Sequence, residues 1–325
     1  MAAAVSTLGP ATAKPSLNAE LADRCIRYKA LADLGIDQIA SETVFDLAEA
    51  GPEILREFAE ARSKGIRLRP TVQSPVSSAE PARRRVADLA GVISRAASNL
   101  KALAAAGADW VQINEPCLAM ALDRETAEAI STSYGLFAQA APQLKLLLVP
   151  GRGALSCNHG LILSLPVTGI HLDCYAEPDQ LADLVVDAAP ESYLSLGISC
   201  TFPPVPEDLL GIFEQLELVA LQRGLVETAR ACANPWPVDL GGRIDFERLA
   251  VERGADRLIL ATSHPDQDAM TPEALQQLGV VVSLARALNI GRQCLGSWAW
   301  QGANVVSMFT NRSAPSPQQP ASGRR

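Results

Sequence analysis

The feature that most constrains the fold is a regular alternation of short apolar segments with longer amphipathic ones. The apolar segments predict strands, because most lack a strict apolar–polar alternation, as is typical of parallel strands buried on both faces. They lie at residues 36–41, 66–73, 109–116, 144–150, 169–175, 193–200, 225–232 and 257–263. Residues 225–232 fit least well, since Glu227, Thr228 and Arg230 interrupt the apolar pattern.

The segments between the predicted strands carry apolar residues three or four positions apart, which is the spacing of one helical face. The first such stripe consists of Leu21, Cys25, Tyr28 and Leu31. Gly65 and Gly107 follow the ends of later stripes, where glycine commonly ends a helix. Strand–loop–helix units recur at about 30–35 residues, which is the length of a parallel βαβ unit.

Strand units of this kind predict a closed (β/α)8 barrel of the TIM type, formed as a single domain. The alternative is an open doubly wound sheet, but no glycine-rich phosphate-binding motif follows any predicted strand. We expect the barrel to occupy residues 18–310. Residues 1–17 are expected to form a flexible N-terminus, and the Pro- and Ser-rich residues 311–325 a disordered tail.

Composition excludes several classes of partner. The chain is 48% hydrophobic, which allows a large core, and its formal net charge of −8 gives no basic surface for nucleic acid. No apolar run reaches the roughly 18 residues that a membrane span requires. The seven cysteines are scattered and form no C-x-x-C pair, which favours a reducing compartment. We therefore expect a cytoplasmic protein with no nucleic-acid or membrane partner.

The ends of the predicted strands supply the candidate site, because barrel enzymes carry their reactive groups there. The phrase WVQINEP at 110–116 stands out, since Pro116 fixes the direction in which the chain leaves the strand after Glu115. A carboxylate held in this way can bind an ammonium group or act as a general acid or base. The alternative is a structural role, as a helix cap or the partner of a basic group.

We predict Glu115 and Asp173 as catalytic residues. Four further residues at strand ends are predicted to bind a ligand: Gln112, Asn114, His171 and Cys232. No metal site is predicted, because a thiolate site needs three or four converging ligands. The Cys/His pairs at 157/159 and 171/174 do not have the usual ligand spacing.

Residues 102–122, ALAAAGADWVQINEPCLAMAL, resemble a segment of cobalamin-independent methionine synthase that reads close to LGVEWVQIDEPALVLDL. Other stretches are similar, in the same order, to phrases of the N-terminal barrel of that family: 57–77, 165–185, 193–200 and 231–240. The resemblance covers roughly residues 50–240 and implies a TIM-type barrel. It also implies methyl transfer from 5-methyltetrahydrofolate to a thiol such as homocysteine.

The chain also departs from the family pattern. Zinc is expected for the family, but its ligands, including a His-x-Cys pair, lie in the C-terminal barrel, and this chain has no H-x-C. Cys232 occupies the place of a lone cysteine in the N-terminal barrel, so a complete zinc ligand set is not implied. Asn114 stands where the family's D-E-P phrase has its aspartate.

The resemblance therefore implies a methionine-synthase-like barrel that holds a folate polyglutamate or a homocysteine-like ligand. A separate chain that carries the catalytic barrel is one candidate partner. Two alternatives stay open. One is a non-catalytic barrel that binds a folate-like ligand or a partner subunit, and the other is a divergent enzyme that uses Glu115 with Asp173 for acid–base chemistry.

Overall fold

The computed structural model describes residues 17–78, 86–151, 155–173, 187–189, 191–199, 255–262, 281–282, 285–286 and 291–294. Its strands are β1 (Gln38–Asp46), β2 (Leu68–Gln73), β3 (Trp110–Glu115), β4 (Lys145–Pro150), β5 (Gly169–Asp173), β6 (Tyr193–Ser199), β7 (Leu258–Thr262) and β8 (Gly291–Cys294). All pair in parallel and close into a barrel in chain order. The predicted (β/α)8 barrel is confirmed, and the pairing of β8 with β1 excludes an open sheet.

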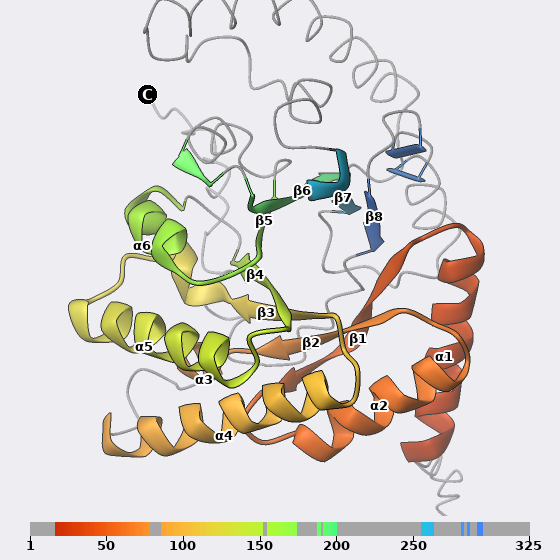
Figure 1. Cartoon of the computed structure of the whole chain (residues 1–325), viewed down its shortest axis with the longest axis horizontal. Helices are drawn as coiled ribbons and strands as arrows, with labels where there is room; N and C mark the ends of the chain where they lie inside the picture. Colours follow the sequence, from red (N-terminus) through yellow and green to blue (C-terminus); the bar gives the residue numbers. More distant parts are fainter. Residues whose placement is uncertain are drawn as a thin grey trace, which may run out of the picture.

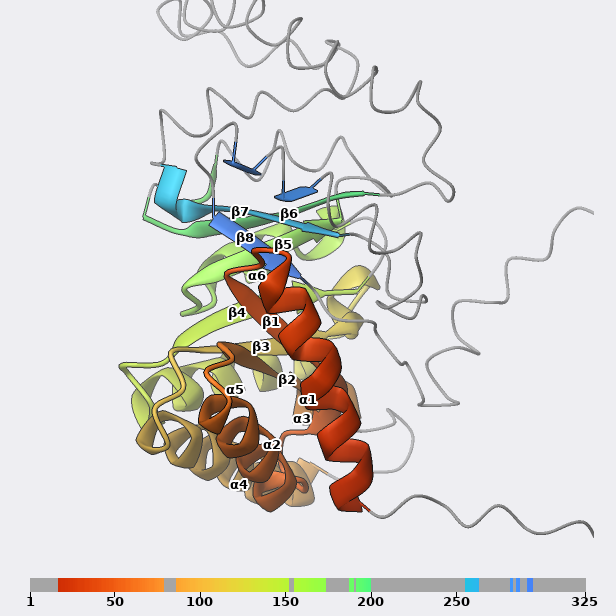
Figure 2. The ribbon, with the colours of Figure 1, turned by 90° about the vertical axis from the view of Figure 1, so that its right-hand side faces the viewer.

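Helices fill the connections of the first half of the barrel. They are α1 (Leu17–Asp33), α2 (Gly51–Ser63), α3 (Pro75–Ser78), α4 (Val86–Ala105), α5 (Arg124–Ala140) and α6 (His159–Ser164), with the 3-10 turns η1 (Pro116–Ala119), η2 (Ser156–Asn158) and η3 (Ala255–Arg257). Figures 1 and 2 show α1, α2, α4 and α5 on the outer side of strands β1 to β4. No helix in the described part of the chain is long and apolar enough to cross a membrane.

Glycines follow the ends of α2 and α4, as predicted. Gly65 follows α2 with φ 71° and Gly107 follows α4 with φ 91°. Positive φ strains any residue with a Cβ atom, so glycine is the residue that lets the chain turn from each helix into the next strand. The predicted domain limits at residues 17 and 311 are not tested, because residues 1–16 and 295–325 lie outside the described part.

The closing strands of the barrel differ from the prediction. β6 pairs directly with β7, and β7 pairs with β8. In the barrel, 193–199 and 258–262 are therefore adjacent, so the barrel position predicted for residues 225–232 was wrong. Those residues themselves lie outside the described part. The closing strand has the sequence GRQC, which carries no apolar run and gives no strand signal.

The register of the strands assigns each side chain to a face of the barrel. Successive residues alternate between faces, and paired residues of parallel strands share one. Val111 and Ile113 of β3 belong to the same core as Phe137 of α5, so they define the outer face. Gln112 and Asn114 alternate with them and therefore belong to the inner face.

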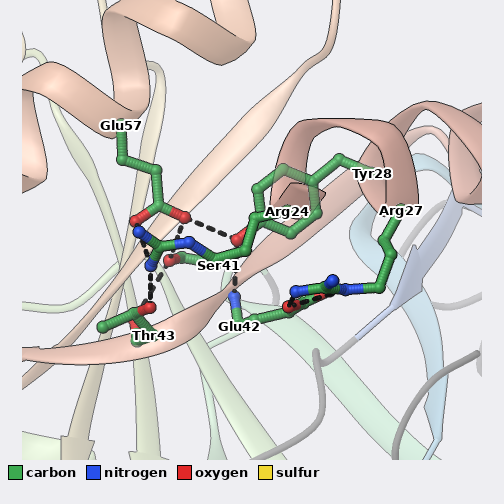
Figure 3. A network of polar contacts seen from close by, with 7 residues as sticks. All are labelled: Arg24, Arg27, Tyr28, Ser41, Glu42, Thr43 and Glu57. Carbon is green, nitrogen blue, oxygen red and sulfur yellow. Dashed lines mark hydrogen bonds and ion pairs between the residues drawn. The ribbon is translucent and has the colours of Figure 1, made fainter. Parts of the chain in front are cut away.

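A buried polar network joins α1, β1 and α2 on the outer side of the barrel (Figure 3). Its centre is Glu57, whose Oε1 accepts hydrogen bonds from Tyr28 Oη at 2.5 Å and Ser41 Oγ at 3.0 Å. Arg24 Nη1 lies 3.3 Å from Glu57 Oε2 and also contacts the Thr43 hydroxyl. The network therefore binds two helices to the middle of β1.

The strand segment held by this network is irregular. Ala40 pairs with Arg69, but Val44 pairs with Thr71, so β1 uses four steps where β2 uses two. An irregularity of this kind bends a strand and redirects its end. The regular pairing resumes up to the end of both strands, where Asp46 and Gln73 are partners.

Candidate functional site

The inner face of β2 and β3 carries polar side chains where aliphatic layers fill many barrels. Thr71 pairs with Gln112 and Gln73 pairs with Asn114, so these four residues project together. Thr71, Gln112 and Asn114 are only 3%, 1% and 1% exposed. Their polar groups must therefore find partners inside the barrel.

The described residues do not satisfy all of these groups. Gln112 Nε2 donates to Asn114 Oδ1 at 3.1 Å. The remaining amide atoms, Gln112 Oε1 and Asn114 Nδ2, have no hydrogen-bond partner, and neither do Thr71 Oγ1 and Gln73 Nε2. Each buried polar group left in this state destabilises a fold by about 1–3 kcal/mol. Four such atoms on one face indicate a site built for a polar ligand or for bound water.

Two further strands contribute to the inner face. His171 of β5 pairs with Ser195 of β6, and His171 Nδ1 lies 3.1 Å from Ser195 Oγ. Arg69 of β2 is fully buried, and its Nη1 donates to Gln38 Oε1 at 3.4 Å. Burial lowers the pKa of His171 to about 3, and the Arg69 charge acts in the same direction. The imidazole is therefore neutral at physiological pH.

We expect His171 to keep its neutral imidazole throughout the range in which an ordinary histidine titrates. Since the unfolded imidazole has a pKa of about 6.5, the unfolded chain gains its proton first as the pH falls. His171 therefore destabilises the fold progressively from about pH 6.5 down to its folded pKa of about 3.

The measurement is an NMR titration of the imidazole Cε1 protons, with the resonance assigned by its loss in His171→Asn. A His171 midpoint close to 6.5 would contradict the buried neutral state.

Glu115 lies on the outer face, because it is the residue next to the inward-facing Asn114. Its carboxyl group is fully buried. Oε1 accepts hydrogen bonds from Ser77 Oγ of α3 at 2.5 Å and from Cys117 Sγ of η1 at 3.2 Å. Burial raises the pKa of Glu115, and the hydrogen bonds from Ser74 and Ser77 counteract part of this effect.

Tyr134 of α5 brings a phenol to the same carboxyl group. Burial raises the pKa of Tyr134 well above its usual range, and the charge of Glu115 adds to this. Neither Glu115 Oε2 nor Tyr134 Oη makes a hydrogen bond of good geometry. The phenol and the carboxyl group are nevertheless close enough to interact with each other. The carboxyl thus lies between the sheet and the helices, where it joins the segments that follow β2 and β3.

The segments after β3 and β4 are joined as well. Asn158 Nδ2 donates to the carbonyl oxygens of Leu118 at 2.8 Å and Met120 at 2.6 Å. Asn158 is 7% exposed. The connections after β2, β3 and β4 are therefore linked in sequence by buried side chains, first Glu115 and then Asn158.

The predicted site residues thus fall into separate groups. Gln112, Asn114 and His171 share the inner face, whereas Glu115 points away from it. Asp173 ends β5 and pairs with Gly197, but its side chain lies outside the described part, as does all of Cys232. The convergence of Glu115 with Asp173 on one substrate stays a prediction without support from the geometry.

Sequence reasoning did not select several inner-face residues: Gln38, Arg69, Thr71, Gln73 and Ser195. A signal was present in residues 66–73, where the polar positions 69, 71 and 73 are two apart and so share one face of a strand. Among the described residues, no three His, Cys, Asp or Glu side chains gather closely enough to hold a metal ion. The described residues therefore do not form a site for the zinc that is expected for the family.

The described part of the chain is thus a (β/α)8 barrel with partnerless polar groups on the inner face of β2 and β3. Residues 37–199 match the family described as "Cobalamin-independent synthase, N-terminal domain". The match covers half of the chain, and the chain belongs to this family. The resemblance inferred from WVQINEP is thus confirmed.

Three relatives carry the name 5-methyltetrahydropteroyltriglutamate–homocysteine methyltransferase. The protein of Nitrobacter winogradskyi is 35% identical over 200 residues, which are 59% of this chain and 26% of the relative. That of Caulobacter vibrioides is 31% identical over 78% of this chain and 32% of the relative. That of Rhodopseudomonas palustris is 29% identical over 86% and 34%. The chain thus spans between a quarter and about a third of these relatives.

Proposed function

We propose that this chain is the ligand-binding barrel of a methyl-transfer system. In this system it holds a methyl-folate polyglutamate or a homocysteine-like ligand, and another barrel carries out the transfer. The observation that carries the proposal is the set of partnerless buried polar atoms on Thr71, Gln73, Gln112 and Asn114. The names of the methyltransferase relatives supply the ligand classes.

The inner-face residues have distinct roles in this proposal. Gln112 and Asn114 offer an acceptor and a donor to the ligand. His171 stays neutral and binds by hydrogen bonding rather than by charge. Arg69 contributes a buried positive charge to the inner face of the barrel.

Activation of a thiol by a metal needs ligands that the described residues do not assemble. For this reason the transfer step is assigned to a separate barrel. A cytoplasmic location is part of the proposal, since the free thiols of Cys25, Cys117 and Cys157 suit a reducing compartment.

The test is calorimetric titration of the full chain with 5-methyltetrahydropteroyltriglutamate and, separately, with homocysteine. We expect saturable binding of at least one of them, and no methionine when both are supplied to this chain alone. Absence of binding by both compounds would overturn the proposal. Methionine formation by the purified chain would show that the transfer step does not need a second barrel.

A further inference from the structure

Glu115 is a fully buried carboxyl group whose described neighbours include no cation. Burial of an ionised carboxylate is costly unless a positive charge compensates it. Glu57 meets this condition, since Arg24 Nη1 lies 3.3 Å from its Oε2. The described side chains that act on Glu115 are instead uncharged hydrogen-bond donors: Ser74, Ser77, Cys117 and Tyr134. The packing therefore favours the protonated form of Glu115.

The elements packed around Glu115 bring two further titratable groups to it. η1 contributes the Cys117 thiol, which donates to Glu115 Oε1 at 3.2 Å, and α5 contributes the Tyr134 phenol. Burial raises the pKa of both groups, and a charge on Glu115 acts in the same direction, so both stay protonated at neutral pH. α3 contributes the uncharged Ser77 hydroxyl at 2.5 Å, and β4 contributes the ladder partner Pro150. Glu115 is therefore the first group of this cluster to lose a proton as the pH rises.

The two segments that Glu115 joins, α3 and η1, are not held equally firmly. Gly151 at the end of β4 lies so close to η1 that a Cβ atom on it would be 2.7 Å from the Pro116 carbonyl oxygen. Asn158 Nδ2 also binds the carbonyl oxygens of Leu118 and Met120. α3, in contrast, is a single turn of four residues. Short segments with few backbone hydrogen bonds open most readily, so α3 is the side that moves.

We propose that Glu115 is a proton-sensitive latch, that is, a group whose protonation decides whether α3 stays packed on η1. The neutral carboxyl group holds α3 closed through Ser77. When the proton is lost, α3 opens and admits water to the carboxylate. Opening also uncovers the Cys117 thiol, since Ser77 Oγ lies 3.1 Å from Cys117 Sγ in the closed form. The latch lies at the carboxyl ends of β2 and β3, so the proton controls the shape of the barrel mouth.

The latch has a specific pH dependence. The exposed carboxyl group of the open form has a pKa of about 4.3, whereas burial raises the pKa of Glu115 in the closed form. Between these two values opening releases one proton, so the ratio of open to closed molecules rises about tenfold per pH unit. Above the higher value both forms are ionised, and the ratio becomes constant.

The test follows the modification of individual cysteines by a dipyridyl disulfide from about pH 4 to pH 8, with peptide mass spectrometry to assign them. Cys157 is exposed and reports the chemistry of a free thiol, whereas the buried Cys25 reports unfolding of the whole barrel. We expect the Cys117 rate, divided by the Cys157 rate, to rise about tenfold per pH unit and then to level off. Cys25 should react more slowly than Cys117 throughout.

Glu115→Gln keeps the side-chain volume but has no proton to lose, so its Cys117/Cys157 ratio should not change with pH. Ser77→Ala keeps the carboxyl group and removes the donor from α3. Its Cys117 should react about fivefold faster than in wild type, the change expected for one lost hydrogen bond, with the same slope against pH. Ser131→Ala, at an exposed position of α5, is the matched control and should behave like wild type.

A wild-type Cys117/Cys157 ratio that does not vary with pH would overturn the latch, and so would a ratio in Glu115→Gln that still rises. Equal rates at Cys117 and Cys25 would overturn it as well, because the whole barrel would then open rather than α3. If Glu115→Gln does not fold, wild type and Ser77→Ala decide the question. Their parallel slopes support the latch, and a rate unchanged in Ser77→Ala contradicts it.

Discussion

Replacement of Glu115 by alanine is expected to lower the free energy of unfolding by about 3–4 kcal/mol. The carboxyl is fully buried and accepts hydrogen bonds from Ser77 and Cys117. Its removal leaves a cavity between β3 and α5, and it leaves the Ser77 hydroxyl without its acceptor. Urea unfolding followed by circular dichroism measures the change. A loss below about 1 kcal/mol would show that these contacts do not hold the segments after β2 and β3 together.

Glu115→Gln is the matched variant, because it keeps an acceptor oxygen and the side-chain volume. Burial raises the pKa of Glu115 in the folded state. The stabilising contribution of the carboxyl is therefore complete below the unfolded pKa of about 4.3 and declines as the pH rises through the folded pKa. Glutamine has no proton to lose, so the stability advantage of wild type over Glu115→Gln should shrink from pH 4 towards pH 7. An advantage that grows over this range would contradict the raised pKa.

The early strands could be predicted from sequence because burial on both faces leaves a continuous apolar run. Leu146 to Val149 of β4 are an example, since these residues are buried on both faces of the strand. The closing strand Gly291–Cys294 could not be found this way, because Arg292 and Gln293 leave no apolar run. Its place follows only from its pairing with β7 and β1.

The site could be predicted only in part, because the direction of each side chain depends on packing. WVQINEP identified the strand end and the family, but a single sequence does not say which alternate residues of a strand face inwards. Asn114 and Glu115 are adjacent and cannot share a face. The sequence therefore required a choice between them, and only the packing of Val111 and Ile113 against the helices decides it. In the sequence, Arg69 and Thr71 interrupt an apolar segment. In the structure they are buried on the inner face of the closed barrel.

The second large effect is expected at Glu57, where alanine should lower the free energy of unfolding by about 3–5 kcal/mol. Glu57 and Arg24 form an ion pair whose side chains are only 2% and 14% exposed. The variant leaves the Arg24 charge, the Tyr28 hydroxyl and the Ser41 hydroxyl without their common acceptor. Glu60→Ala is the control, because Glu60 lies half-exposed on the same helix and pairs with Lys64 at the surface; this variant should stay within about 0.5 kcal/mol of wild type.

The same network should also control the irregular part of β1, since the Glu42 amide donates to Tyr28 Oη at 2.9 Å. Tyr28→Phe removes this acceptor, and Glu57→Ala removes the group that orients it. Both variants should therefore speed hydrogen exchange at the Glu42 amide while the amides of β3 and β4 remain protected. If the Glu42 amide stays protected in both, β1 keeps its irregular path without the network, because pairing with β2 alone then suffices to bring Asp46 beside Gln73. Loss of protection in both would instead make Glu57 a positioning residue for the strand end at the mouth of the barrel.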